Sequence, residues 1–283
     1  MSNLYFLKTN SFEYPDGECL STEILTSINR CDFNIAINQA DAFLRKLSDL
    51  KGSSTVEEVK SDIFISEQFI KLLSYVAKYW LAITRQEFSN SWLVLQDILD
   101  YLRCIKKFHK KRNLVVNFIE KQFIALESSY PYRLFSSVGI VVDYYKCSVC
   151  GLDIDSFECT HLKGELYNGE IAYGIANRIL HFDHCALVET PLDKRCAIPI
   201  EDNSEQFGVQ KDLSEYVNKG KLPPFGFKNI EIISYRKDNP DYIDLPRNAP
   251  CFCGSNIKFK KCCISKKMIE HKHFEFIHGQ LFA

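Results

Sequence analysis

The spacing of hydrophobic residues divides the chain into a helical first part and a strand-rich remainder. In the first part apolar residues recur every three or four positions, which is the period of one face of an α-helix. The clearest run predicts a helix that begins after Asp32 as N-cap and stops near Gly52. Its apolar positions are Phe33, Ala36, Ile37, Ala40, Leu44 and Leu47.

Three further helices follow from the same period. One runs over about 63–85 and is apolar around most of its circumference, which predicts a central, buried position. Asn90 or Ser91 is a candidate cap for the next helix, and Asn113 for the last. Because short connections favour antiparallel neighbours, we expect an α-helical bundle, and we assign 1–130 to a helical domain.

After Pro131 the pattern becomes that of short strands. Residues 133–145, 166–180 and 182–188 are rich in β-branched and aromatic side chains, and glycine or polar turns separate them. These segments predict a small β-rich domain over 131–217.

The C-terminal part is predicted to be a connection followed by a small module. Residues 218–229 are predicted to be a linker or an ordered loop, and 230–236 to be one more strand, within a connecting segment that ends at residue 249. The module occupies 250–283, and we expect a short helix over 265–278 at its end.

Composition places the protein among ordinary globular proteins and draws attention to its cysteines. Of 283 residues, 46% are hydrophobic and 25% are charged, and the formal net charge of -1 provides no global attraction to nucleic acid or membrane. Neither a secretory signal nor a transmembrane segment is visible, so we expect a cytoplasmic protein with reduced thiols. Seven of its twelve cysteines lie in two tight clusters, which in that compartment favours metal binding over disulfides.

The first cluster has the spacing C-x2-C-x8-C-x-H. Zinc prefers four such ligands at tetrahedral corners, and a C-x-x-C turn places two thiolates on one side of the ion. The predicted ligands of this closed, structural site are Cys147, Cys150, Cys159 and His161. His181, His184 and Cys185 are rivals for the place of His161. The alternative interpretation is a set of unrelated buried cysteines beside a surface histidine.

The residues around this cluster resemble a cysteine-knuckle variant of the phage prohead (head-maturation) protease family, over roughly 135–200. The segments that carry the resemblance are Ser136-Ser137-Val138-Gly139, Cys147-Ser148-Val149-Cys150-Gly151, Cys159-Thr160-His161, Gly164, Tyr167-Asn168-Gly169 and Ala186-Leu187-Val188. The resemblance implies that Ser137 corresponds to the nucleophile. The chain departs from the family pattern in two ways: His109 is the only upstream histidine, and Ala186 occupies the place of a usual serine.

The second cluster has the spacing C-x-C-x8-C-C, with four thiolates in thirteen residues. The segment 250–263, PCFCGSNIKFKKCC, resembles the SEC-C motif, a zinc-binding module found at the C-terminus of the SecA preprotein translocase motor and of many other bacterial proteins. Phe252 stands where a second proline is common. The resemblance implies zinc binding and an interaction role, since such modules bind proteins and, in some members, the ribosome. The implied ligands are Cys251, Cys253, Cys262 and Cys263.

Charge is distributed unevenly along the chain. Residues 103–112 hold six basic residues and no acid, and 147–205 hold eleven acids against four bases. The basic stretch is either a solvated helix end or a surface for RNA, DNA or an acidic protein, and it could also meet the acidic stretch within the molecule. The candidate partner-binding cations are Lys106, Lys107, Lys110, Lys111 and Arg112, together with Lys258, Lys260 and Lys261 in the tail.

The sequence therefore predicts an α+β protein with an N-terminal helical bundle, a zinc-stabilised β-rich domain and a small C-terminal zinc module. The leading hypothesis is a non-enzymatic adaptor with two structural Zn²⁺ sites, whose tail recruits a protein or ribonucleoprotein partner. One alternative is a prohead-protease-like serine hydrolase that uses Ser137, or a degenerate form of such an enzyme. Another is a nucleic-acid-binding accessory protein of phage–host conflict.

Overall fold

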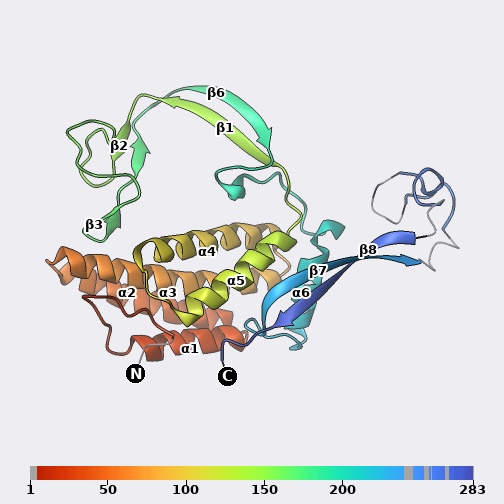
Figure 1. Ribbon diagram of the computed structural model, residues 1–283, viewed down its shortest axis with the longest axis horizontal. Coiled ribbons are helices and arrows are strands. Elements are labelled where there is room, and N and C mark those ends of the chain that lie inside the picture. Colours follow the sequence, from red (N-terminus) through yellow and green to blue (C-terminus); the bar gives the residue numbers. More distant parts are fainter. Residues whose placement is uncertain (1–4, 239–244, 252–254, 256, 265–267, 283) are drawn as a thin grey trace.

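A helical body forms the centre of the molecule, and two long β-ribbons extend from it. The computed structural model describes residues 5–238, 245–251, 255, 257–264 and 268–282. Figure 1 shows the helices of the first half lying side by side. Their bounds are α1 Gly17–Asn29, α2 Phe33–Ser53, α3 Glu57–Thr84, α4 Phe88–Phe108 and α5 Leu114–Ser129.

Helix α3 is the centre of the body. It packs against α1, α2, α4 and α6 (Gly208–Asn218), and Tyr79 and Trp80 on it are fully buried. The broad distribution of apolar residues around α3 explains this position, because a helix that is apolar on most sides must be covered on most sides. The prediction of a central helix is confirmed. Within the described residues, no helix is both long and apolar enough to cross a membrane.

The predicted helix ends are correct in part. Asp32 is the N-cap residue of α2, and the Asn113 side chain caps α5 by accepting a hydrogen bond from the Val116 N–H at 3.1 Å. The prediction that Asn90 or Ser91 caps the next helix is wrong, because α4 already begins after Glu87. Both residues lie inside its first turn, and the Ser91 N–H donates to the Glu87 carbonyl.

Helix α6 was not predicted, and it belongs to the helical body. Its side chains Leu213 and Val217 are buried in the same core as the first five helices. The segment after it, which was predicted to be a linker or an ordered loop, also packs on this core through Phe225 and Phe227. The buried amide of Gln122 on α5 donates to the carbonyls of Pro224 and Phe227, both at 2.8 Å.

Each long ribbon consists of two antiparallel strands. In the first, β1 (Phe135–Val142) pairs with β6 (Ile179–Val188), and in the second, β7 (Phe227–Asp238) pairs with β8 (Met268–His278). Figure 1 shows the β1–β6 ribbon arching over α4 and the β7–β8 ribbon running outward from the body. The remaining strands form two small pairs beyond β1: β2 (Tyr145–Cys147) with β5 (Gly174–Ala176), and β3 (Leu166–Tyr167) with β4 (Glu170–Ile171).

Two predicted elements differ in the structure. The strand expected over 166–180 is broken, because Asn168 and Gly169 have φ angles of 50° and 77° and form the two-residue turn between β3 and β4. The helix expected over 265–278 is wrong: 268–278 is strand β8, paired with β7 along its length, and 265–267 lie outside the described residues. Phe274 and Phe276, two residues apart, pack on the core from one face of this strand.

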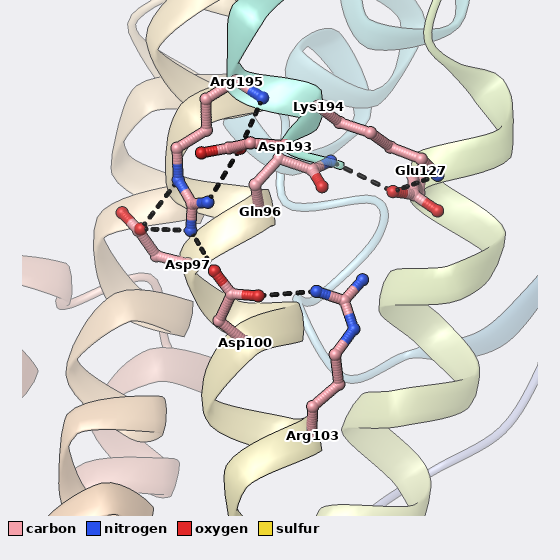
Figure 2. Close-up of polar contacts among 8 residues, drawn as sticks. All are labelled: Gln96, Asp97, Asp100, Arg103, Glu127, Asp193, Lys194 and Arg195. Atoms are coloured by element: carbon pink, nitrogen blue, oxygen red, sulfur yellow. Dashed lines mark hydrogen bonds and ion pairs between the residues drawn. The ribbon is translucent and has the colours of Figure 1, made fainter. Parts of the chain in front are cut away.

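A polar clamp fixes the end of the first ribbon to the body (Figure 2). After β6 the chain forms a short 3-10 helix, Lys194–Cys196. The Arg195 guanidinium donates to Asp97 on α4 at 2.7 and 3.1 Å and also bonds to Asp100 and Asp193. On the other side, Lys194 pairs with Glu127 of α5 at 2.9 Å. The ribbon therefore returns to the body beside α4 and α5.

Candidate metal centres

Each cysteine cluster lies at the far end of one of the two ribbons. The chain runs out along β1, passes through the first cluster and returns along β6; it then runs out along β7, passes through the second cluster and returns along β8. Figure 1 shows the end of the β7–β8 ribbon projecting away from the helices, whereas the chain beyond β1 and β2 bends back so that β3 lies beside them. A two-stranded ribbon buries little surface of its own, so its tip needs another source of stability.

The first cluster is built on a tight turn that follows β2. Cys147 is the last residue of this strand, and its N–H and carbonyl both take part in the turn, with Leu152 and Gly151 as partners at 2.7 and 2.9 Å. Gly151 has a φ of 75°, a conformation that costs glycine little. The turn therefore returns the Cys150 side chain toward Cys147, as a C-x-x-C knuckle requires.

The ligand atoms of the first cluster have the spacing of a tetrahedral metal site. The three sulfurs and one imidazole nitrogen all lie within 4.8 Å of one another. The Cys150 and Cys159 sulfurs are 3.7 Å apart, and the Cys159 sulfur is 3.9 Å from Nδ1 of His161. Two sulfurs bound to one zinc at ~2.3 Å and a tetrahedral angle would be ~3.8 Å apart. All described cysteines are free thiols.

His161 is the histidine that joins this cluster. The edge of its ring meets the ring of Tyr167, with centroids 4.7 Å apart, and the Tyr167 hydroxyl accepts a hydrogen bond from the Leu162 N–H. The sequence drew attention to Tyr167 only through the family resemblance and predicted no role for it at the metal cluster. The rivals His181, His184 and Cys185 lie on β6, paired with β1, and do not belong to the group.

The electrostatics of the first cluster suit a cation. Desolvation raises the pKa of the Cys147 thiol, but hydrogen bonds from the backbone N–H groups of Cys150 and Val149 and from the neighbouring thiols together outweigh it, and the resulting pKa is lowered. At Cys159 a backbone N–H at His161 acts in the same direction, but desolvation and the neighbouring sulfurs leave the pKa raised. Neighbouring thiols resist losing their protons together because the resulting thiolates repel each other. A cation bound between the thiolates offsets this repulsion.

The loops beyond the first cluster touch the helical body. Lys107 at the end of α4 pairs with Glu165 at 2.8 Å and donates to the Gly164 carbonyl at 2.6 Å. On α3, the Glu57 carboxylate accepts the Asn168 N–H at 3.1 Å. The acidic stretch therefore meets the basic stretch within the molecule at Lys107, which the charge distribution allowed.

The second cluster is built around a short hairpin-like turn. The Cys251 N–H donates to the Ile257 carbonyl at 2.8 Å, and the Phe259 N–H donates to Ala249 at 2.9 Å. Phe259 is 3% exposed and packs with Cys251 and Cys263 in a small cluster separate from the main core. This cluster is too small to hold a fold by hydrophobic burial alone.

Three sulfurs of the second cluster also lie within 4.8 Å of one another, those of Cys251, Cys262 and Cys263. The Cys262 and Cys263 sulfurs are 3.7 Å apart, again close to the ~3.8 Å edge of a tetrahedral zinc site. Cys253, the fourth predicted ligand, lies outside the described residues. The Ser255 hydroxyl is 3.2 Å from the Cys262 sulfur, a contact that the sequence did not predict. The cations of the motif, Lys258, Lys260 and Lys261, are exposed.

Ser137 lies in the middle of β1, opposite Ala186 of β6. His184, two residues before Ala186, faces Gly139, and its Nδ1 contacts the Asp183 carboxylate at 3.0 Å. Among the described residues no hydrogen bond joins Ser137 to an imidazole. The structure thus offers no direct contact that would activate this serine.

Comparison with known proteins identifies one motif. Residues 247–264 match the SEC-C motif, which covers the second cysteine cluster and a small part of the chain. No curated protein and no solved structure matches the chain. The motif and the two cysteine clusters together indicate metal binding.

Proposed function

We propose that the protein is a non-enzymatic adaptor that holds two structural Zn²⁺ ions, and that its SEC-C module recruits a protein or ribonucleoprotein partner. The observation that carries the proposal is the SEC-C match over 247–264 together with the three sulfurs gathered there. The module lies at the end of a ribbon that projects from the body, where a partner can reach it.

The donor sets favour zinc. Thiolates with one imidazole, and four thiolates with Cys253 as the fourth, are the ligand sets of structural zinc sites. The sulfur separations of 3.7 Å in both clusters suit this ion. With four protein ligands each site is closed, so the metal would hold the fold of the tip and would not activate water.

An interaction role is supported by charge and position. Four thiolates around Zn²⁺ carry about -2, and the exposed Lys258, Lys260 and Lys261 surround them with positive charge. Acidic protein surfaces and phosphate backbones are the partners that such a surface attracts. The strands β7 and β8 carry this surface away from the helices, so binding needs no rearrangement of the body.

The decisive experiment compares partners and metal content in three proteins. Asp238 and Met268 face each other at the end of the β7–β8 pair. In the first variant a two-residue Asn-Gly turn replaces all residues between them, which removes the module. The second variant is Cys262→Ser/Cys263→Ser in the full chain. The matched control is Cys185→Ser/Cys196→Ser, which changes two exposed cysteines outside both clusters.

We expect the wild type and the control to bind two equivalents of zinc, and both module variants to bind one. A partner that copurifies with the wild type and the control, and is lost from both module variants, would support the adaptor function. Full zinc content in Cys262→Ser/Cys263→Ser would contradict the metal assignment. Unchanged partners after removal of the module would contradict the recruitment role.

A further inference from the structure

The basic stretch over 103–112 is divided by the fold into a neutralised part and an exposed part. Three of its six cations have carboxylate partners at 2.5, 2.7 and 2.8 Å. The pairs are Arg103–Asp100, Lys106–Glu120 and Lys107–Glu165. A long nucleic-acid backbone needs a continuous row of available cations, and along α4 these carboxylates interrupt the row.

The other three cations gather at the connection between α4 and α5. Lys110, Lys111 and Arg112 are exposed, and within the part of the chain that the structure describes none of them has an ion pair. They line a hollow of about 340 Å³ that contains no carboxylate. The other residues that line it are Ile105, Lys106, His109, Asn113, Val116 and Asn117.

The surroundings of the hollow add to its positive potential. Helix α5 begins at Leu114, after the three cations and the cap residue Asn113, so the positive end of its dipole lies at the hollow. His109 responds to the same potential: burial and the Lys111 charge lower its pKa, and Asp62 opposes them only in part. An anion in the hollow would reduce the repulsion among these groups.

We propose that this hollow, which we call the α4–α5 corner, binds the phosphate group of a small phosphorylated ligand. Three cations with flexible or forked donors can surround one or two phosphate groups, and Arg112 can bind phosphate oxygens in pairs. The neighbouring surface groove along α4 and α5 is lined by Arg103, Lys106 and Lys107 together with Glu120 and Glu127. Because all three cations have carboxylate partners, this groove adds little attraction for an extended polyanion. The site therefore favours a compact anion over a nucleic-acid strand.

The test measures the binding of pyrophosphate to the full chain by calorimetry at low salt. The variant Lys111→Gln/Arg112→Gln removes two charges from the corner. The matched control Arg45→Gln/Lys46→Gln removes two charges from an exposed pair on α2. A ten-nucleotide single-stranded RNA without terminal phosphates is the second probe. Circular dichroism establishes that each variant retains its helical content.

We expect saturable binding of pyrophosphate that weakens roughly tenfold or more in Lys111→Gln/Arg112→Gln, since the variant loses two charged hydrogen-bond donors. The control should bind as the wild type does, and pyrophosphate should shift the NMR signals of the His109 imidazole. Equal weakening in both variants, or no saturable binding, would overturn the proposal. So would tighter binding of the RNA than of pyrophosphate, which would favour a nucleic-acid surface.

Discussion

The buried amide of Gln122 connects the helical body to the base of the second ribbon, and its removal gives a specific prediction. The side chain is fully buried on α5, and its Nε2 donates to the carbonyls of Pro224 and Phe227 at 2.8 Å each. The Pro224 carbonyl lies just before β7, and the Phe227 carbonyl belongs to the first residue of this strand. We consider Gln122→Met, which keeps the length of the side chain and removes both donors.

The expected loss of stability follows from the groups left behind. Each carbonyl that loses its hydrogen bond while buried costs about 1–3 kcal/mol, so two cost about 2–6 kcal/mol. One term opposes this loss, because Oε1 of Gln122 has no hydrogen-bond partner among the described residues, and its removal recovers about 1–3 kcal/mol. A net destabilisation of about 2 kcal/mol lies in the middle of this range.

Urea unfolding followed by circular dichroism measures the effect as a lower midpoint. The matched control is Lys121→Met, the neighbouring residue on α5, which is exposed and should stay within about 0.5 kcal/mol of the wild type. If Gln122→Met unfolds at the same urea concentration as the control, the two hydrogen bonds do not hold the base of the ribbon.

Three further predictions concern the first ribbon and the α4–α5 corner. Gly169→Ala would place a Cβ 2.8 Å from the Lys60 carbonyl oxygen, at a φ of 77°. Because this clash would loosen the tip of the first ribbon from the body, limited proteolysis should cut the tip faster, while zinc content stays the same. Unchanged proteolysis would contradict the docking of the tip. His161→Ala should remove one equivalent of zinc and leave helical circular dichroism unaltered, and full zinc content would return one of the rival ligands to consideration. Burial and the Lys111 charge disfavour the protonated His109 imidazole, so its pKa should lie below the ordinary histidine value of 6.5. Because the unfolded chain then binds this proton more readily than the folded one, His109 makes the fold less stable as pH falls through this range. An NMR titration that gives a pKa at or above 6.5 would refute this.

Helical periodicity in the sequence was sufficient to predict most of the helical body. The apolar pattern predicted the central position of α3, and Asn113 carried a cap signal that the structure confirms. The pattern of α6 was also present, since Val209, Leu213 and Val217 recur every four residues and are buried. It was missed because the helix is short and lies between strand-rich and proline-rich segments, where no helix was expected.

The strands were harder to place because their partners are distant in sequence. The terminal segment that became β8 owes its conformation to β7, thirty or more residues earlier at every paired position, and local spacing does not record such a pairing. The β1–β6 ribbon differs in another way, since Val138, Phe182 and Leu187 are 56%, 74% and 63% exposed. Apolar residues usually predict burial, but here only two strands are present and no second layer covers these side chains.

The metal clusters were predictable because their information is local. Ligand type and spacing were sufficient to predict that Cys147, Cys150 and Cys159 share one site. The choice of His161 over its rivals as the fourth ligand needed the three-dimensional arrangement. Sequence spacing could not indicate where the clusters lie on the molecule. That depends on the register of two ribbons, which long-range pairing determines.

The position of β8 has a consequence for the order in which the protein can fold during synthesis. β7 emerges from the ribosome well before its partner, and the SEC-C module is made in between. Until β8 arrives, β7 has an open hydrogen-bonding edge, and Leu281, which is buried in the main core, is missing. Metal binding by the module would shorten the loop that β8 must close and so hasten this last step. We therefore expect newly made chains to be degraded faster in zinc-starved cells, although their helices have formed.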